Sequence, residues 1–173
     1  MAATIHWVVT VVGQDRPGLV DALSDWVVGV GGDWQDSHLT HIGDQFAGIL
    51  EVYLPVDSRD TFLAEVPVVE QQTGLSLTLR EAGQVVEEGQ VFDLACVGQD
   101  RPGIVKALTD ILLEVRANVE TLETSSHPAP MSGEQLFEAN FRVRLPEGVD
   151  PGDVEGRLSR IGDELMLDVQ LDR

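Results

Sequence analysis

The chain has 173 residues and a formal net charge of −19 at pH 7, from 30 acidic and 11 basic residues. Both halves share the acidic excess, with three basic and twelve acidic residues in 1–85 and eight and eighteen in 86–173. This balance argues against direct nucleic-acid contact, because phosphate contacts with Lys and Arg supply most of the non-specific affinity. The sequence shows neither a basic-then-apolar leader nor a run of about 18 apolar residues, so we expect a cytoplasmic protein without membrane contact.

The first predicted element is a β-strand over residues 5–12, rich in β-branched side chains. A helix follows, in which apolar residues recur at helical spacing: Leu19, Ala22, Leu23, Trp26, Val27 and Val30. The next predicted elements are strands over 34–42 and 46–54 joined by a turn at Gly43–Asp44, a helix from about Ser58, and an alternating strand over 75–79. Pro67 predicts a kink or an early end in the second helix.

A repeated turn divides the chain in two. The segment VGQDRPGLV at Val12–Val20 returns as VGQDRPGIV at Val97–Val105, each time between an apolar strand and a helical pattern. The second repeat then follows the order of the first: a strand over 91–97, a helix over Ile104 to Val115, strands over 118–124 and 137–145, a helix carrying Val154, Leu158 and Ile161, and a strand over 165–171. The connection between its two middle strands, residues 125–133, is longer than the tight turn of the first repeat.

Each repeat therefore predicts the order βαββαβ. This order is typical of an α+β, ferredoxin-like fold, a four-stranded antiparallel sheet with two helices on one face. We expect one domain over 1–82, an acidic linker over 83–89 and a second domain over 90–173. Units of this size bury only about 60–65% of their unfolded surface, so we expect the repeats to pack extensively on each other and two chains to pair as a homodimer.

The repeated turn has the chemistry of a helix start. An Asp can cap the helix, Pro suits the first helical turn, and the glycines Gly13, Gly18, Gly98 and Gly103 permit tight turns and close backbone approach. Amides without partners at a helix N-terminus can hold a carboxylate, so each turn is a candidate ligand site. The alternative is a tight helix entry that binds nothing.

Two βαββαβ units that each open with a strand and Gly-Gln-Asp-Arg-Pro-Gly resemble a tandem pair of ACT domains over nearly the whole chain. Within this family, the sequence resembles glycine cleavage system transcriptional repressors, which have two such domains, and the amino-terminal domain of formyltetrahydrofolate deformylases. The segment Ala129–Gly133 before Phe137 supports that subgroup. The resemblance implies a regulatory module that binds an amino acid at the seam between two paired domains.

Carried onto this chain, the resemblance implies ligand contacts in the turns Gly13–Gly18 and Gly98–Gly103 and at the start of the second strand of each repeat. Asn118 matches an Asn that grips the ligand in serine-binding relatives, whereas Asp33 stands in its place in the first repeat. The two implied sites are therefore unequal.

The charged residues of the turns leave alternatives open. Because an Asp side chain repels a carboxylate, Asp15 and Asp100 would cap their helices or accept the amino group of a ligand. Arg16 and Arg101 can clamp a carboxylate bidentately or pair with a nearby acid. Asn118 is a ligand contact or only a polar residue after a helix end.

Metal and catalytic patterns do not emerge. Of four histidines only His38 and His41 are close in sequence, and strand residues three apart point to opposite faces. The single Cys96 excludes an internal disulfide and a cysteine metal cluster, and we expect it buried on the first strand of the second repeat. Without a Gly-x-Ser-x-Gly motif or paired acids in an apolar setting, we expect neither enzymatic activity nor a cofactor.

The three tryptophans all lie in the first repeat. Trp26 falls on the apolar stripe of the first helix and is predicted to be core. Trp7 and Trp34 are predicted to cover the sheet or to line an interface between the repeats.

These patterns support two functional hypotheses. The first is a regulatory protein that senses a small amino acid such as glycine and acts through a protein partner rather than on DNA. The second is a ligand-free assembly module that uses its sheet faces or edges to dimerise and to dock a client enzyme.

Overall fold

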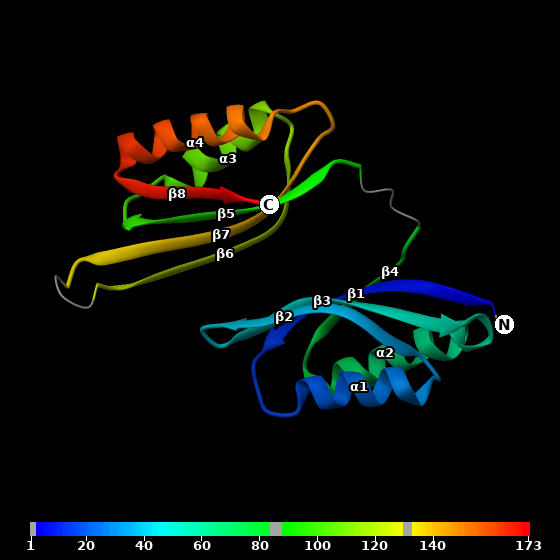
Figure 1. The fold of residues 1–173 in the computed structure, drawn as a ribbon. Helices are drawn as coiled ribbons and strands as arrows, with labels where there is room; N and C mark the ends of the chain where they lie inside the picture. The colour runs from blue at the N-terminus through cyan, green and yellow to red at the C-terminus, as the bar shows by residue number, and fades with distance from the viewer. Residues whose placement is uncertain (1–2, 84–87, 130–132) are drawn as a thin grey trace. The chain divides into compact units, whose positions relative to one another are not determined.

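The structure is a computed structural model that describes residues 3–83, 88–129 and 133–173. The chain divides into two compact units, Met1–Val85 and Val86–Arg173, each with one sheet and its own helices (Figure 1). The packing of the two repeats on each other stays a prediction, as do the exact domain boundaries.

The first unit has a four-stranded sheet. Its elements are β1 (Thr4–Gln14), α1 (Leu19–Gly29), β2 (Asp33–Ile42), β3 (Gln45–Pro55), the short 3-10 helix η1 (Val56–Ser58), α2 (Arg59–Thr73) and β4 (Ser76–Glu81). The strand order is β2-β3-β1-β4, with every neighbouring pair antiparallel. Figure 1 shows α1 and α2 together on one face of this sheet.

The second unit repeats this topology. Its elements are β5 (Gln90–Gln99), α3 (Ile104–Glu114), β6 (Asn118–Pro128), β7 (Gln135–Leu145), α4 (Pro151–Leu165) and β8 (Leu167–Asp172). The strand order is β6-β7-β5-β8, again antiparallel throughout. The predicted fold class, two βαββαβ units with two helices on one face of each sheet, is confirmed.

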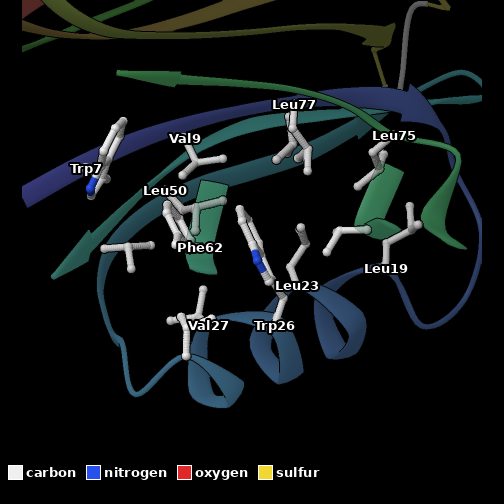
Figure 2. Packing of buried hydrophobic residues seen from close by; sticks show 14 of the residues in the cluster. Trp7, Val9, Leu19, Leu23, Trp26, Val27, Leu50, Phe62, Leu75 and Leu77 are labelled. Atoms are coloured by element: carbon white, nitrogen blue, oxygen red, sulfur yellow. The ribbon is translucent and has the colours of Figure 1, made fainter. Parts of the chain in front are cut away.

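The core of the first unit lies between its sheet and its two helices (Figure 2). Trp26 stacks on Phe62 with 4.4 Å between the ring centroids and 6° between the planes, which confirms its core position. Trp7 is also buried, 6.0 Å from Phe62 and tilted by 55°, and Trp34 packs partly buried against the same cluster. The prediction that Trp7 covers the sheet or lines an interface is therefore wrong, because Trp7 fills the core of its own unit. For the partly buried Trp34, a place at an interface stays a prediction.

The second unit has a matching core between its sheet and α3 and α4, centred on Phe92, Leu94, Phe141 and Leu158. Cys96 is only 3% exposed in this cluster, as predicted. The aromatic content differs, however, since Phe92 stands where the first unit has Trp7.

The segment 125–128 is not a loop as predicted. Ser125 to Pro128 continue β6 and pair with Glu138 to Gln135 of β7, so the β-hairpin is longer than in the first unit. Polar side chains do not oppose this extension on an edge strand, because the ladder is formed by the backbone. Residues 130–132 of the predicted connection lie outside the described residues.

Two helix ends also differ from the prediction. Helix α2 continues through Pro67 to Thr73, and Pro67 is exposed, so the carbonyl group that loses its helical partner can face water. Leu165, predicted to open the last strand, is instead the last residue of α4. Met166 then takes a left-handed conformation (φ 58°) and β8 begins at Leu167.

Candidate functional site

The turn that joins the first strand to the first helix is built alike in both units. The Asp15 amide donates to the Asp44 carbonyl at 2.8 Å, and the Asp100 amide donates to the Gln135 carbonyl at 2.8 Å. Each turn is thereby tied to the β-hairpin of its own sheet. The turn residues from Asp15 to Gly18 are exposed, which leaves their surface open to a ligand.

The N-cap residue of each helix is the second glycine of the motif. Gly18 has φ 91° and ψ 1°, Gly103 has φ 94° and ψ 0°, and no side chain caps either helix. The prediction that Asp15 and Asp100 cap the helices is wrong, because each lies three residues before its N-cap and its amide is used by the hairpin. The proline also precedes the N-cap instead of opening the first helical turn.

The first glycine of the motif, Gly13 or Gly98, makes close backbone contact within its own unit. A Cβ on Gly13 would lie 2.8 Å from the Gly74 carbonyl oxygen, and a Cβ on Gly98 would lie 2.6 Å from the Met166 carbonyl oxygen. The close approach that the motif predicts therefore occurs between the end of the first strand and the turn before the last strand. Close packing therefore explains why both turns have a glycine at this position.

The two motif arginines are held differently. Arg16 donates to the carbonyl of Gln72 near the C-terminus of α2, where carbonyl groups lack helical partners and a cation is favoured. Arg101 donates to Gln99 Oε1 at 2.9 Å and lies 3.9 Å from Met166 Sδ. Neither guanidinium forms an ion pair with a described residue. A ligand carboxylate that binds Arg16 or Arg101 would therefore not have to displace an acidic side chain.

The two motif aspartates also differ. Ser126 Oγ donates to Asp100 Oδ2 at 2.7 Å and lies 3.5 Å from Gln135 Oε1. Asp15 is exposed, and among the described residues its side chain has no such hydroxyl partner. The sequence pattern gives no signal for Ser126, because only the register of the extended hairpin brings it beside Asp100.

Asn118 lies far from the turn of its own unit. Gln99 at the turn pairs with Leu136, whereas Asn118 pairs with Arg144 eight residues further along β7, roughly 27 Å at about 3.4 Å per residue. The first unit shows the same separation, with Gln14 opposite Gln45 and Asp33 opposite Tyr53. The implied site residues thus form two groups at opposite ends of each sheet.

The surroundings of Asn118 are charged. Arg144 Nε donates to Glu120 Oε1 at 2.6 Å, and both side chains are largely buried. Arg142 lies 3.6 Å from Glu120 and 3.7 Å from Asp93. Glu120 stands at a bulge between β6 and β7, a feature that the sequence pattern does not signal.

The histidines make ordinary side-chain contacts. His6 Nε2 lies 2.5 Å from Glu51 and its ring stacks on Tyr53 at 4.7 Å. His38 pairs with Ile49 and His41 with Phe46, which places the two side chains on opposite faces of the sheet. Within residues 3–83, 88–129 and 133–173, no three His, Cys, Asp or Glu side chains lie close enough to hold a metal ion.

Among the residues that the structure describes, Cys96 is the group whose pKa the fold clearly shifts. Burial raises the pKa of its thiol, and the negative charge of Asp168 raises it further. The thiol is therefore protonated at neutral pH and is a poor nucleophile.

The ACT domain family matches this chain twice, over residues 6–80 and 94–172. The chain belongs to the ACT-domain family and carries two copies of the domain. No helix of the described residues is both long and apolar enough to cross a membrane. A search of curated proteins yields no match.

Solved structures resemble this chain to different extents. An unknown protein from Galdieria sulphuraria is 30% identical, with 98% of each chain covered and a TM-score of 0.82. A protein described as a candidate glycine cleavage system transcriptional repressor is 17% identical, with 99% of this chain and 98% of its own covered and a TM-score of 0.67, which shows a shared fold. A formyltetrahydrofolate deformylase from Pseudomonas putida KT2440 matches 49% of this chain and 29% of its own, at 21% identity and a TM-score of 0.40.

Proposed function

We propose that this chain is a non-enzymatic regulatory protein that binds a small amino acid, such as glycine, and acts through a protein partner. The observation that carries the proposal is the presence of two ACT domains whose first turns have the same uncapped helix start. The tandem arrangement shared with the candidate glycine cleavage system repressor supports a role in amino-acid regulation.

The turn chemistry suits a zwitterion. The first helical hydrogen bond of α1 runs from the Ala22 amide to the Gly18 carbonyl at 3.0 Å, so the preceding amides are available to a ligand carboxylate. The neighbouring Asp15 or Asp100 carboxylate would accept the ligand ammonium group. A free carboxylic acid without an amine would meet repulsion from the same Asp.

We propose that Asn118 or Asp33 of one domain contacts a ligand held by the turn of a neighbouring domain. Because each lies at the far end of its own sheet, a ligand that touches a turn and one of these residues must bridge two ACT domains. The chain's net charge of −19 favours control through a protein partner over direct DNA contact.

Titration calorimetry of the full chain with glycine, serine, alanine and aspartate tests the proposal. We expect saturable heat and a raised melting temperature with at least one of them, and a loss of affinity in Asp15→Asn or Asp100→Asn that identifies the occupied turn. Asp25→Asn, an exposed residue on α1, is the control with the same charge change. Absence of heat and of a thermal shift with all four amino acids at millimolar concentration would refute the sensing function.

A second candidate function, an assembly module without ligand, is favoured by apolar side chains on the outer face of the first sheet. Val12, Ile49 and Tyr53 are 47%, 51% and 37% exposed on the face away from the helices. Exposed apolar side chains on one face of a sheet are available for contact with a protein partner. Sedimentation of the unchanged chain and of Ile49→Asp tests this function. A dimeric unchanged chain and a monomeric variant support it, whereas a monomeric unchanged chain contradicts it.

A further inference from the structure

Each sheet has two outer strands, which present backbone amides and carbonyls away from the sheet (Figure 1). In the first unit, a side chain closes the edge of β4, because Glu70 Oε1 accepts from the Leu77 amide at 2.7 Å. The outer strands β2 and β6 each have a β-bulge near their start. Edge caps and bulges both oppose the addition of a further strand.

In the described part of the chain, the edge of β8 has neither of these features. β8 pairs with β5 along its whole length without a register shift. Val169 lies opposite Cys96, just as Leu77 lies opposite Val11 in the first unit. Since the two sheets share this register, the Val169 amide also points away from its neighbouring strand, as the Leu77 amide does.

Gly162 explains why this amide stays open. Glu70 and Gly162 occupy the same place in α2 and α4, four residues before the C-cap. A Cβ on Gly162 would lie 2.9 Å from the Leu167 carbonyl oxygen and 2.9 Å from Val169 Cγ2, so α4 lies too close to β8 for a side chain here. Among the described residues, no side chain takes over the part of Glu70 and accepts from the Val169 amide.

The side chains of β8 define the chemistry of an added strand. Asp168 and Asp172 are exposed on the face away from the helices, and neither forms an ion pair with a described residue. Val169 and Leu171 are half-buried on the helix side. An added strand would meet these two sets alternately, so it needs basic residues on one face and apolar residues on the other. A second copy of β8 does not fit, because it would place aspartate against aspartate.

A hollow of about 150 Å³ on the same outer face can receive one of the basic side chains. Its walls include Ala95 and Val97 of β5, Glu138 of β7 and Asp168 of β8. These residues lie opposite one another in the ladder, so all of them face away from the helices. The methylene groups of an arginine or lysine would lie against Ala95 and Val97, and its charge would meet a carboxylate on either side.

We propose that β8 adds an extended segment of a protein partner in which basic and apolar residues alternate, with two basic residues spaced like Asp168 and Asp172. The proposal rests on the proposed action through a protein partner and names the chemistry of that partner. In an antiparallel arrangement, the apolar residues opposite Val169 and Leu171 would exchange backbone hydrogen bonds with β8. The basic residue opposite Asp168 would reach the hollow.

NMR titration of the isotope-labelled full chain with the end-blocked peptide Arg-Val-Thr-Val-Arg tests the proposal. We expect saturable shifts and slowed hydrogen exchange of the Val169 and Leu171 amides. The acidic peptide Glu-Val-Thr-Val-Glu should not bind. The basic peptide with both valines N-methylated keeps its charge but loses the amides that face β8, so it should bind at least about tenfold more weakly.

Asp168→Asn should weaken the basic peptide about two- to fivefold, the usual effect of losing an exposed ion pair. Asp153→Asn, exposed in the first turn of α4, is the control with the same charge change and should leave binding unchanged. Equal binding of the N-methylated peptide, shifts that miss the β8 amides, or no saturable binding would overturn the proposal.

The peptide titration contains no amino-acid ligand, so its outcome is separate from that of the sensing experiment. Peptide binding at β8 without heat from any of the four amino acids would support the docking edge and refute only the sensing function. Amino-acid binding without peptide binding would refute the docking edge and leave the sensing function in place.

Discussion

Replacing Gly13 by Ala should destabilise the first unit even though it adds a single methyl group. The new Cβ would lie 2.8 Å from the Gly74 carbonyl oxygen, 2.9 Å from Leu75 Cδ2 and 3.1 Å from Leu75 Cα. The Leu75 methyl can move, but the other two atoms belong to backbone that leads into β4. Overpacking of this kind typically costs about 1–3 kcal/mol, a large part of the stability of a small domain.

Two further Gly→Ala variants separate packing from backbone conformation. Gly18 faces open space but has φ 91°, so Gly18→Ala should cost about 1–2 kcal/mol, and Gly18→Asn should cost less because Asn enters the left-handed region more readily. At Gly13, Asn should be no better than Ala. Gly29, in α1 with nothing within 4 Å, is the control, and Gly29→Ala should stabilise the unit by up to about 1 kcal/mol.

Urea unfolding followed by tryptophan fluorescence measures these changes, because all three tryptophans belong to the first unit. Circular dichroism of the same samples reports both units. A free energy of unfolding for Gly13→Ala within about 0.5 kcal/mol of the unchanged chain would refute the close approach between β1 and the turn before β4.

Three other predictions follow from buried groups and a cap. Phe62→Ala should cost about 3–5 kcal/mol in urea unfolding and change the fluorescence of Trp26, whose ring it stacks on. Asp150→Ala should cost about 0.5–2 kcal/mol, because the Gly152 amide loses its cap, and hydrogen exchange at the first turn of α4 should rise. Burial raises the pKa of the Cys96 thiol in the folded chain. The contribution of this shift to the free energy of unfolding is therefore fully present below the unfolded pKa of about 8.5 and is lost as the pH rises through the folded pKa. The free energy of unfolding should therefore fall more steeply above pH ~8.5 in the unchanged chain than in Cys96→Ala, and equal slopes would contradict the shift.

The elements could be predicted because apolar periodicity records which face of each segment is buried. It records nothing about a polar edge strand, so the pairing of Ser125 to Pro128 was missed. It also cannot separate a buried tryptophan from one at an interface, because both are apolar positions on a strand. Trp7 is core because its strand position faces the helices and Phe62 lies beneath it.

The candidate site could be predicted only as a set of residues. The sequence locates the turns, but the separation of Asn118 from Gly98–Gly103 depends on strand direction. A β-strand that follows a helical crossover runs parallel to the strand before it, so its start lies at the opposite end from the turn. The partners of the motif side chains, Ser126 and the Gln72 carbonyl, depend on tertiary contacts that no local pattern encodes.

Under the proposed function, this separation would link ligand binding to assembly. A ligand that needs both a turn and Asn118 binds only where two ACT domains are paired, and it stabilises that paired state by about 2.7 kcal/mol at a hundred times its dissociation constant. Pairing between chains is opposed by their net charge of −19, and this repulsion is strongest at low salt, where screening is weak. Glycine should therefore shift the sedimentation of the chain most at low ionic strength. A ligand effect that is independent of both salt and protein concentration would mean that the site is complete within one chain.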